Sequence, residues 1–228
     1  MVGLTCENKI VKKMKKVIQT PQSFAMNQKS WLRPSEARSL IRAVLELPPD
    51  RLKARPTTFG VPTPRLTASA GTVDYIHWHK IEREPMIPQI TSLMQKLCKM
   101  GYTNLNVVNI NVYRSNSDSI IDHCDKDPLM IEKSPIVSVS AGAPRTLVIK
   151  GKKTYKFLME SGDLFTMEGA FQQEFTHGVP KSSSTKQPNS NLFSLGECVL
   201  LDGVSVPLNQ IRVNVSFRCN KQQQVSDK

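Results

Sequence analysis

Two stretches of the chain repeat apolar residues at the spacing of an α-helix. The first opens at Pro34-Ser35 and stops at Pro48-Pro49, and the second lies between Pro88 and Gly101. Proline suits the first turn of a helix but not its interior, and glycine suits the residue just past its end. The apolar positions are Ala37, Leu40, Ile41, Val44 and Leu47 in the first stretch, and Ile90, Leu93, Met94, Leu97 and Cys98 in the second. The pattern predicts two helices that each pack one face on a core.

Beyond residue 104 the pattern changes to the two-residue alternation of β-strands. Short runs, separated by glycine, proline and serine, lie near residues 104–113, 135–141, 145–150, 154–159, 163–167, 171–177, 196–201 and 211–218. Residues 51–74 contain three prolines and two glycines, which indicate a loop or irregular strand, and Tyr75–His79 alternates. Many short strands after two helices predict a mainly β fold with flanking helices, built as a sandwich or jelly-roll barrel.

The length bounds the number of domains. A chain of 228 residues can bury a substantial core as one large domain. We expect an N-terminal extension over residues 1–30, one domain over residues 31–220 and a short polar tail over residues 221–228. We expect this domain to be a monomer.

The cysteines and the apolar runs indicate where the protein works. The five cysteines (Cys6, Cys98, Cys124, Cys198 and Cys219) are odd in number, widely spaced and without a CxxC pair. They suggest neither a disulfide framework nor a zinc ribbon, so a reducing compartment fits best. The chain has no apolar run of the roughly 18–20 residues that a membrane span needs, and its start lacks the apolar region of a signal peptide. We therefore expect an intracellular protein of the nucleus or cytoplasm that is neither secreted nor bound to a membrane.

The formal net charge of +12 is concentrated near the start of the chain. Residues 1–58 contain twelve Lys and Arg against four Asp and Glu, which gives +8. A basic surface binds polyanions by releasing their counterions, so nucleic acid is the first partner to consider and an acidic membrane the second. A solvated run of charge is the alternative. Lysines and apolar residues alternate at helical spacing over Lys9–Ile18, which fits a basic amphipathic helix or a nuclear-import patch.

One predicted strand carries polar side chains in front of a metal-ligand signal. Asn109, Asn111 and Tyr113 share a face, because every second side chain of a strand points the same way. Ten residues after Tyr113 come His123 and Asp125, which project together on an extended segment. An imidazole and a carboxylate at this spacing can chelate one ion.

His177 supplies a third candidate ligand near the end of a later predicted strand. Two histidines and one carboxylate make a facial triad, which binds one face of Fe(II) and leaves positions open for a co-substrate and O₂. A structural zinc site would need four protein ligands, typically with thiolates. The set therefore indicates an iron centre.

Other residues near this signal have competing interpretations. His77 and His79 also have chelating spacing, so an HxH pair with a remote acid is an alternative to their lying on a lid strand. Cys124 lies between two ligands, but alternation points its side chain to the other face. It is interpreted as a small buried hydrophobe.

The last predicted strand, Ile211–Arg218, has one apolar and one polar face. The apolar face carries Ile211, Val213, Val215 and Phe217, and the polar face carries Arg212, Asn214, Ser216 and Arg218. An arginine that points into a barrel must find an anion, because burying an unpaired guanidinium is costly. A dicarboxylate would satisfy Arg212. Arg218 lies about 20 Å farther along an ideal strand at ~3.3 Å per residue, so the two arginines should serve opposite ends of a site.

Several ordered motifs resemble the AlkB family of Fe(II)- and 2-oxoglutarate-dependent dioxygenases. They are Asn111-Val-Tyr113, His123-Cys-Asp125-Lys-Asp127, Ser134-Pro-Ile-Val-Ser-Val-Ser140, Thr176-His-Gly178 and Arg212-Val-Asn-Val-Ser-Phe-Arg218. The similarity covers about residues 58–220. It implies a double-stranded β-helix (jelly-roll) core over residues 104–220, preceded by a lid and supporting helix over residues 58–100.

The same resemblance implies roles for individual residues. His123, Asp125 and His177 would hold Fe(II), with O₂ as the second co-substrate. The 2-oxoglutarate contacts would come from Asn111, Tyr113, Arg212, Asn214 and Arg218, with Arg218 near the end that the metal chelates.

The resemblance also suggests which residues read the substrate. Asp127 falls where the family often has an acid that reads the alkylated base, and Arg65 lies in a motif, Pro64-Arg-Leu-Thr-Ala, like the start of the nucleotide-recognition lid. Where many members continue with Trp-Tyr, this chain has Ser69-Ala70, so Tyr75 and Trp78 are the substitute stacking aromatics. Residues 181–191 form a polar loop in a long gap between His177 and Arg212, which suggests a lid or a disordered segment.

The activity that this resemblance implies is oxidative demethylation of bases such as 1-methyladenine and 3-methylcytosine in DNA or RNA. Such an enzyme needs an open metal site, a dry pocket and a single-stranded or flipped base. Two alternatives are a 2-oxoglutarate dioxygenase that acts on a protein or small molecule, and an inactive basic nucleic-acid-binding module. The complete triad argues against the inactive module.

Overall fold

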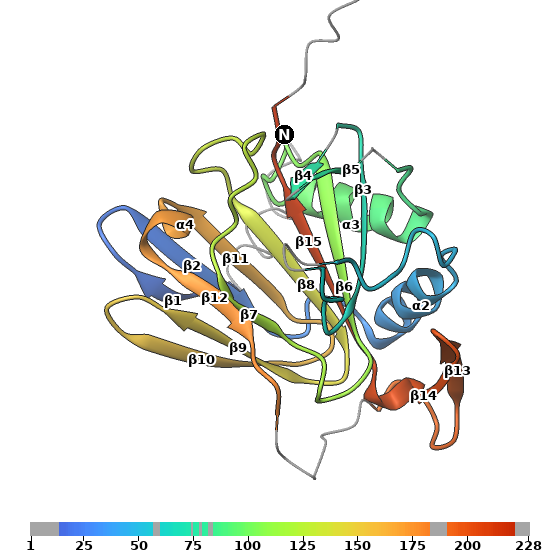
Figure 1. The fold of residues 1–228 in the computed structure, drawn as a ribbon. Coiled ribbons are helices and arrows are strands. Elements are labelled where there is room, and N and C mark those ends of the chain that lie inside the picture. Colours follow the sequence, from blue (N-terminus) through green and yellow to red (C-terminus); the bar gives the residue numbers. More distant parts are fainter. Residues whose placement is uncertain are drawn as a thin grey trace, which may run out of the picture.

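Two antiparallel sheets face each other in this computed structural model, which describes residues 14–56, 60–73, 75–77, 79–81, 84–182 and 191–221 (Figure 1). The larger sheet contains, in spatial order, β1 (Lys15–Gln19), β2 (Ser23–Gln28), β11 (Leu164–Gly169), β8 (Ile136–Gly142), β15 (Arg212–Arg218), β6 (Val107–Tyr113) and β3 (Leu66–Gly71). The smaller sheet contains β10 (Thr154–Met159), β9 (Arg145–Lys150), β12 (Thr176–Val179) and β7 (Ile120–His123). The predicted jelly-roll class, mainly β with flanking helices, is confirmed.

The central strands of the larger sheet separate an apolar layer from a polar one. Val112, Val213 and Val139 lie on the outer face and belong to the main hydrophobic cluster. On the inner face, Asn111 is the cross-strand neighbour of Asn214, and Asn214 is the neighbour of Ser140. Because side chains alternate along each strand, the sheet can bury a core on one side and line a polar pocket on the other.

The two predicted helices pack on the outer face of the larger sheet. They are α2 (Pro34–Leu45) and α3 (Pro88–Lys99), each opened by its proline, and their buried apolar residues join the main cluster. In Figure 1 both lie beside β3, β6 and β15, away from the smaller sheet. Among the described residues, no helix is long and apolar enough to cross a membrane.

The start of the chain corrects two predictions. Lys15–Gln19 is a strand rather than part of a helix, and it pairs with β2, which pairs in turn with β11. Ile18 is buried with Ala25 and Met167 between the sheets, and this packing outweighs the helical spacing. Residues 15–28 therefore belong to the larger sheet, so the extension predicted over residues 1–30 is wrong for this part. Residues 1–13 lie outside the described residues.

Two further segments differ from prediction. Residues 66–71, expected to form a loop or irregular strand, form the regular strand β3. They do so because they pair with β6 on the side away from β15. The strand predicted at residues 171–177 begins as a short helix, α4 (Phe171–Glu174), before β12. The helical turn stacks the rings of Phe171 and Phe175 with centroids 4.6 Å apart, a contact that side chains four residues apart make in a helix but not in a strand.

The remaining elements lie at the periphery. They are the paired strands β4 (Tyr75–His77) and β5 (His79–Ile81), the hairpin of β13 (Cys198–Leu201) and β14 (Val204–Pro207), and the 3₁₀ turn η1 (Leu208–Gln210) that leads into β15.

Candidate metal centre

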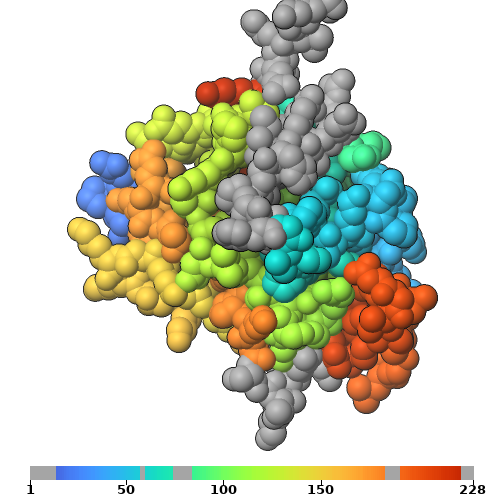
Figure 2. All heavy atoms as spheres, viewed as in Figure 1, coloured from blue at the N-terminus to red at the C-terminus, as the bar shows by residue number. Residues whose placement is uncertain are grey.

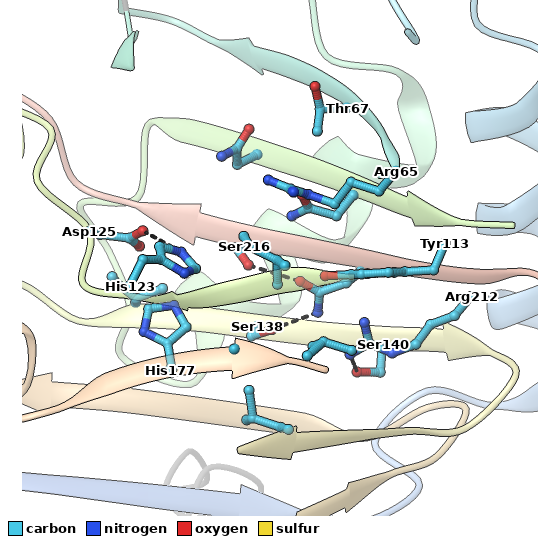
Figure 3. A pocket seen from close by; sticks show the side chains of 18 of the residues that line it. Arg65, Thr67, Tyr113, His123, Asp125, Ser138, Ser140, His177, Arg212 and Ser216 are labelled. Atoms are coloured by element: carbon cyan, nitrogen blue, oxygen red, sulfur yellow. Dashed lines mark hydrogen bonds and ion pairs between the residues drawn. The ribbon is translucent and has the colours of Figure 1, made fainter. Parts of the chain in front are cut away.

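The three predicted metal ligands come together at one end of the pocket between the sheets (Figure 3). His123, at the end of β7, is the direct cross-strand partner of His177 on β12, and their ring centroids are 4.4 Å apart. Asp125 follows two residues after β7, with Oδ1 3.5 Å from His123 Nε2. One potential ligand atom from each residue lies within 4.8 Å of the others. The geometry fits one shared metal ion.

The protonation states of the ligands also suit a metal. Burial lowers the pKa of His177 to about 4, so the imidazole is neutral at pH 7. Burial acts to raise the pKa of Asp125, but Arg218 and the histidines outweigh it and hold that pKa well below its usual range. Metal ligands must be deprotonated, and these two are.

The ring nitrogens provide a further test of the fit. His123 Nδ1 lies 2.9 Å from the carbonyl oxygen of Ile121, a contact that orients the ring and leaves Nε2 toward Asp125. His177 Nδ1 is buried and has no hydrogen-bond partner among the described residues. A donor set of two imidazoles and one carboxylate fits Fe(II).

The alternative HxH pair lies on other strands than the triad. His77 and His79 face each other across β4 and β5, in a separate two-stranded sheet. Their side chains lie outside the described residues. Among the side chains that are described, His123, Asp125 and His177 form the one such cluster.

Arg212 lies in the pocket with unused hydrogen-bond donors. Its Nη2 donates to Ser140 Oγ at 3.0 Å, while Nε and Nη1 are buried without a partner among the described residues. The guanidinium carbon lies 5.2 Å from the centre of the Tyr113 ring. Burial lowers the pKa of Arg212, as expected for a cation without an anion beside it. A carboxylate of a bound ligand would satisfy these donors.

Arg218 lies at the metal end of the same strand. Its Nη2 and Nε donate to Asp125 Oδ2 at 2.7 and 3.0 Å. Arg212 lies beside Tyr113 and away from the triad (Figure 3). Arg218, at the other end of the strand, pairs with Asp125.

The two predicted asparagines line the pocket but already have partners. Asn111 Oδ1 accepts from Arg65 Nε at 2.7 Å. Asn214 Nδ2 donates to Ser138 Oγ at 2.7 Å, and Ser216 Oγ donates to Asn214 Oδ1 at 3.2 Å. Asn214 therefore braces the polar face of the sheet as well as facing the pocket.

Arg145 lies against the pocket residue Tyr113 and was not predicted from the sequence. It is buried at the start of β9 and donates to the carbonyl oxygens of Ser115, Asp118 and Pro180 at 2.7–2.8 Å. Its guanidinium carbon lies 5.4 Å from the centre of the Tyr113 ring. Arg145 thus joins the loop after β6 and the loop after β12 beside the Tyr113 ring. No local pattern in the sequence predicts these contacts.

Ser138, Ser140 and Gln172 were also missed. The serines alternate along β8 and hold Asn214 and Arg212, and the alternation of their motif was available as a signal. Gln172 Oε1 accepts from the backbone nitrogen of Asp125 at 2.9 Å. Gln172 belongs to α4, where a strand was predicted.

The predicted substrate residues are only partly brought together. Arg65 lines the pocket. Asp127 does not line it, because its carboxylate accepts from Leu129 N at 2.9 Å and from Asn220 Nδ2 at 2.6 Å and is thereby buried in the C-terminal part of the fold. Trp78 and the side chain of Tyr75 lie outside the described residues.

Comparison with known proteins agrees with this geometry. A family model described as the 2OG-Fe(II) oxygenase superfamily matches residues 25–218. The chain is 33% identical over 146 residues to the α-ketoglutarate-dependent dioxygenase alkB homolog 3 of Mus musculus, covering 58% of this chain and 51% of that protein. It is 24% identical over 120 residues to the DNA oxidative demethylase ALKBH2 of Mus musculus, covering 48% of this chain and 50% of that protein.

A solved structure extends the likeness to the fold. The structure of OsALKBH1 has a TM-score of 0.63 at 16% identity and covers 90% of this chain and 100% of that one. The chain spans about half the length of the curated relatives it matches. The superfamily match implies Fe(II), 2-oxoglutarate and O₂ as cofactor and co-substrates. From the matched length, the relatives and the assembled triad, the chain belongs to the AlkB family of Fe(II)- and 2-oxoglutarate-dependent dioxygenases.

Proposed function

We propose that this protein demethylates N-alkylated bases, such as 1-methyladenine and 3-methylcytosine, in DNA or RNA. The observation that carries the proposal is the triad at one end of a pocket that also contains the buried, incompletely paired Arg212. The names of the relatives, which include a DNA oxidative demethylase, support nucleic acid as the substrate class.

At the metal end of the pocket, the triad would bind the iron and two other residues hold one of its ligands in place. His123, Asp125 and His177 would hold Fe(II), which with 2-oxoglutarate and O₂ supplies hydroxylation of the N-alkyl carbon, with release of formaldehyde, succinate and CO₂. Arg218 keeps the Asp125 carboxylate ionised and oriented through two hydrogen bonds. Gln172 holds the backbone of the same ligand, so the metal end is braced from two elements.

Arg212 and Tyr113 would bind the distal carboxylate of 2-oxoglutarate. The guanidinium of Arg212 would supply the positive charge and its two unpaired N–H groups the hydrogen bonds to that carboxylate. The hydrogen bond to Ser140 orients the guanidinium. The guanidinium groups of Arg145 and Arg212 both lie close to the Tyr113 ring, with their carbons 5.4 and 5.2 Å from its centre. Asn111 and Asn214 complete the polar wall along which the co-substrate would lie.

Turnover of methylated oligonucleotides tests this function. The purified protein is incubated with Fe(II), 2-oxoglutarate and methylated DNA and RNA oligonucleotides, and formaldehyde and succinate are measured together. We expect the two products in equal amounts. His177→Ala should abolish both, whereas His77→Ala, on the separate strand β4, should retain activity.

The alternative substrate class gives a different result. If 2-oxoglutarate is consumed but no methylated oligonucleotide loses a methyl group, the proposal for nucleic acid is wrong. Turnover stimulated by a peptide or small molecule would then support a dioxygenase of another substrate class.

A further inference from the structure

One of the three candidate metal ligands is held differently from the other two. His123 and His177 lie on paired strands, where each is the direct cross-strand partner of the other. Asp125 lies beyond the end of β7, outside any strand, and its backbone nitrogen donates to the side chain of Gln172 at 2.9 Å. At Asp125 a side-chain hydrogen bond thus takes the place of strand pairing. The position of this ligand therefore depends on where Gln172 is held.

The hydrogen bonds of Gln172 fix the orientation of its amide group. Its Oε1 accepts from Asp125 N, and its Nε2 donates to the sulfur of Met167 at 3.7 Å. A backbone N–H needs an acceptor, so the oxygen of the amide must face Asp125. Met167 is buried on β11, which pairs with β2 on one side and with β8 on the other. Gln172 therefore connects Asp125 to an inner strand of the larger sheet.

The helical turn α4, which carries Gln172, begins against the turn between β1 and β2. Ala170 N donates to the carbonyl oxygen of Gln22 at 3.0 Å. Gly169, just before it, has a φ of +70°, and a Cβ at this position would lie 2.2 Å from the same carbonyl oxygen. Glycine therefore permits the close approach of α4 to the N-terminal hairpin of β1 and β2.

A side-chain hydrogen bond joins the end of α4 to the same hairpin. Thr20 Oγ1 donates to Glu174 Oε2 at 2.7 Å and accepts from Ser23 N at 2.9 Å, so Thr20 also closes the turn between β1 and β2. In Figure 2 the orange residues of α4 lie between the blue residues of the N-terminal hairpin and the yellow-green residues that follow β7. The helical turn thus connects the N-terminal hairpin to the segment that contains Asp125.

We propose that α4 sets the affinity of the triad for its metal ion, because through Gln172 it ties the backbone of Asp125 to the N-terminal hairpin. Gln172 is then a positioning residue, which acts through a ligand and does not touch the metal. The inference rests on the proposed ligand role of Asp125 and is independent of the substrate. Loss of a residue that orients a metal ligand typically weakens metal binding by roughly 10–100-fold.

Three substitutions separate positioning from packing. Gln172→Leu keeps a side chain of similar size and removes the acceptor, whereas Gln172→Glu keeps an oxygen that can accept from Asp125 N. Gln173→Ala is the matched control, because Gln173 is exposed on the same helical turn and donates to Glu132 Oε1 at 3.0 Å rather than holding a metal ligand.

The affinity of the metal-free protein for Co(II), which stands in for Fe(II), is measured by calorimetric titration without 2-oxoglutarate or nucleic acid. We expect Gln172→Leu to weaken Co(II) binding about tenfold. Gln172→Glu should bind Co(II) at least as tightly as the wild type, and Gln173→Ala should match the wild type. Urea unfolding of the metal-free proteins is measured in parallel, because a merely structural role would lower stability without changing the Co(II) affinity of the folded protein.

A double-mutant cycle tests the connection to the N-terminal hairpin. Thr20→Val keeps the shape of the side chain and removes its hydrogen bond to Glu174. We expect Thr20→Val to weaken Co(II) binding about twofold in the wild type. It should have no further effect in Gln172→Leu, where the connection to the ligand is already broken.

The inference is overturned if Gln172→Leu binds Co(II) as tightly as the wild type, if Gln173→Ala weakens binding equally, or if Thr20→Val has the same effect with and without Gln172. His177→Ala separates this failure from a failure of the proposed metal centre. If His177→Ala abolishes Co(II) binding and Gln172→Leu leaves it unchanged, the centre stands and the inference alone is wrong. If His177→Ala itself leaves Co(II) binding unchanged, the proposed centre is wrong and the inference fails with it.

Discussion

At the scale of single residues, Arg212 gives the most direct prediction. Its free donors are aimed into the pocket, so Arg212→Ala should raise the KM for 2-oxoglutarate at least about tenfold, whichever lesion is offered. Ser140→Ala removes one hydrogen bond of the guanidinium and should have a smaller effect in the same direction. Steady-state kinetics with varied 2-oxoglutarate measures both. A loss confined to one type of lesion would instead assign Arg212 to the substrate.

Asp127 should behave as a structural acid. Both of its oxygens accept hydrogen bonds, one of them from the side chain of Asn220 after the last strand. Asp127→Ala removes the acceptor of both hydrogen bonds and should reduce the free energy of unfolding by about 1–3 kcal/mol. Urea unfolding measures this, with demethylation of a cationic and a neutral lesion in parallel. Unchanged stability with a selective loss on the cationic base would return Asp127 to the base-reading role that the resemblance implied.

Alternation explains which residues of the site could be predicted. Asn111, Tyr113 and Arg212 face the pocket because every second side chain on β6 and β15 points inward, a property visible in the sequence. Arg145 could not be found in this way, because its partners come from loops that are distant in the chain. A residue whose role depends on tertiary contacts leaves no local pattern.

At the scale of elements, an ion pair joins the two helices on the outer face of the larger sheet. Glu36 of α2 bonds to Lys96 of α3 and to Arg33. Partial burial acts to raise the pKa of Glu36, but these hydrogen bonds outweigh it and lower it to about 2. The ionised carboxylate therefore stabilises the folded protein above its ordinary pKa of 4.5, and this contribution is lost as the pH falls toward 2.

Glu36→Gln should therefore lower the free energy of unfolding by about 0.5–1 kcal/mol near neutral pH. The difference from the wild type should shrink below about pH 4.5. Urea unfolding of both proteins between about pH 7 and pH 3 measures it. Ser39→Ala, on the same helix, should give a difference that does not vary with pH. A Glu36→Gln effect that persists unchanged at the acid end would assign the loss to packing rather than charge.

The spacing of apolar residues predicts some elements of this fold correctly and others wrongly. The spacing of apolar residues predicts α2 and α3 correctly, because each helix packs one apolar face on a sheet. The same spacing failed near Ile18, where the edge strand β1 pairs with β2 and buries Ile18 against the sheets instead. The direct pairing of His123 with His177 depends on the register of β7 and β12, and register across distant strands is not a local property.

At the scale of the whole molecule, the two faces of the larger sheet account for the arrangement. The outer face carries the apolar residues that bind the helices and stabilise the fold. The inner face carries the polar residues that surround the pocket, and the smaller sheet adds two of the three metal ligands opposite it. Stability and chemistry are thus divided between the sides of one sheet, so substitutions on the two faces should affect different measurements.

The basic start of the chain gives a prediction for the intact molecule. Residues 1–13 contain three lysines and one glutamate, whereas residues 15–28 form β1 and β2 of the larger sheet. Deleting residues 1–13 should weaken non-specific binding of single-stranded nucleic acid and reduce the salt slope by up to about 2, since each phosphate contact contributes about 0.7. Replacing Lys9, Lys12 and Lys13 by Gln in the full chain should reproduce the change without altering length.

Deleting residues 1–30 should have a different outcome, because it removes two strands from the sheet and exposes β11 and the buried contacts of Ile18. We expect loss of cooperative unfolding rather than a weaker salt slope alone. Binding at several salt concentrations and thermal unfolding of both deletions separate the two effects. An unchanged salt slope without residues 1–13 would mean that these lysines are solvated charge, and the affinity would then have to come from the folded domain and its arginine-lined pocket.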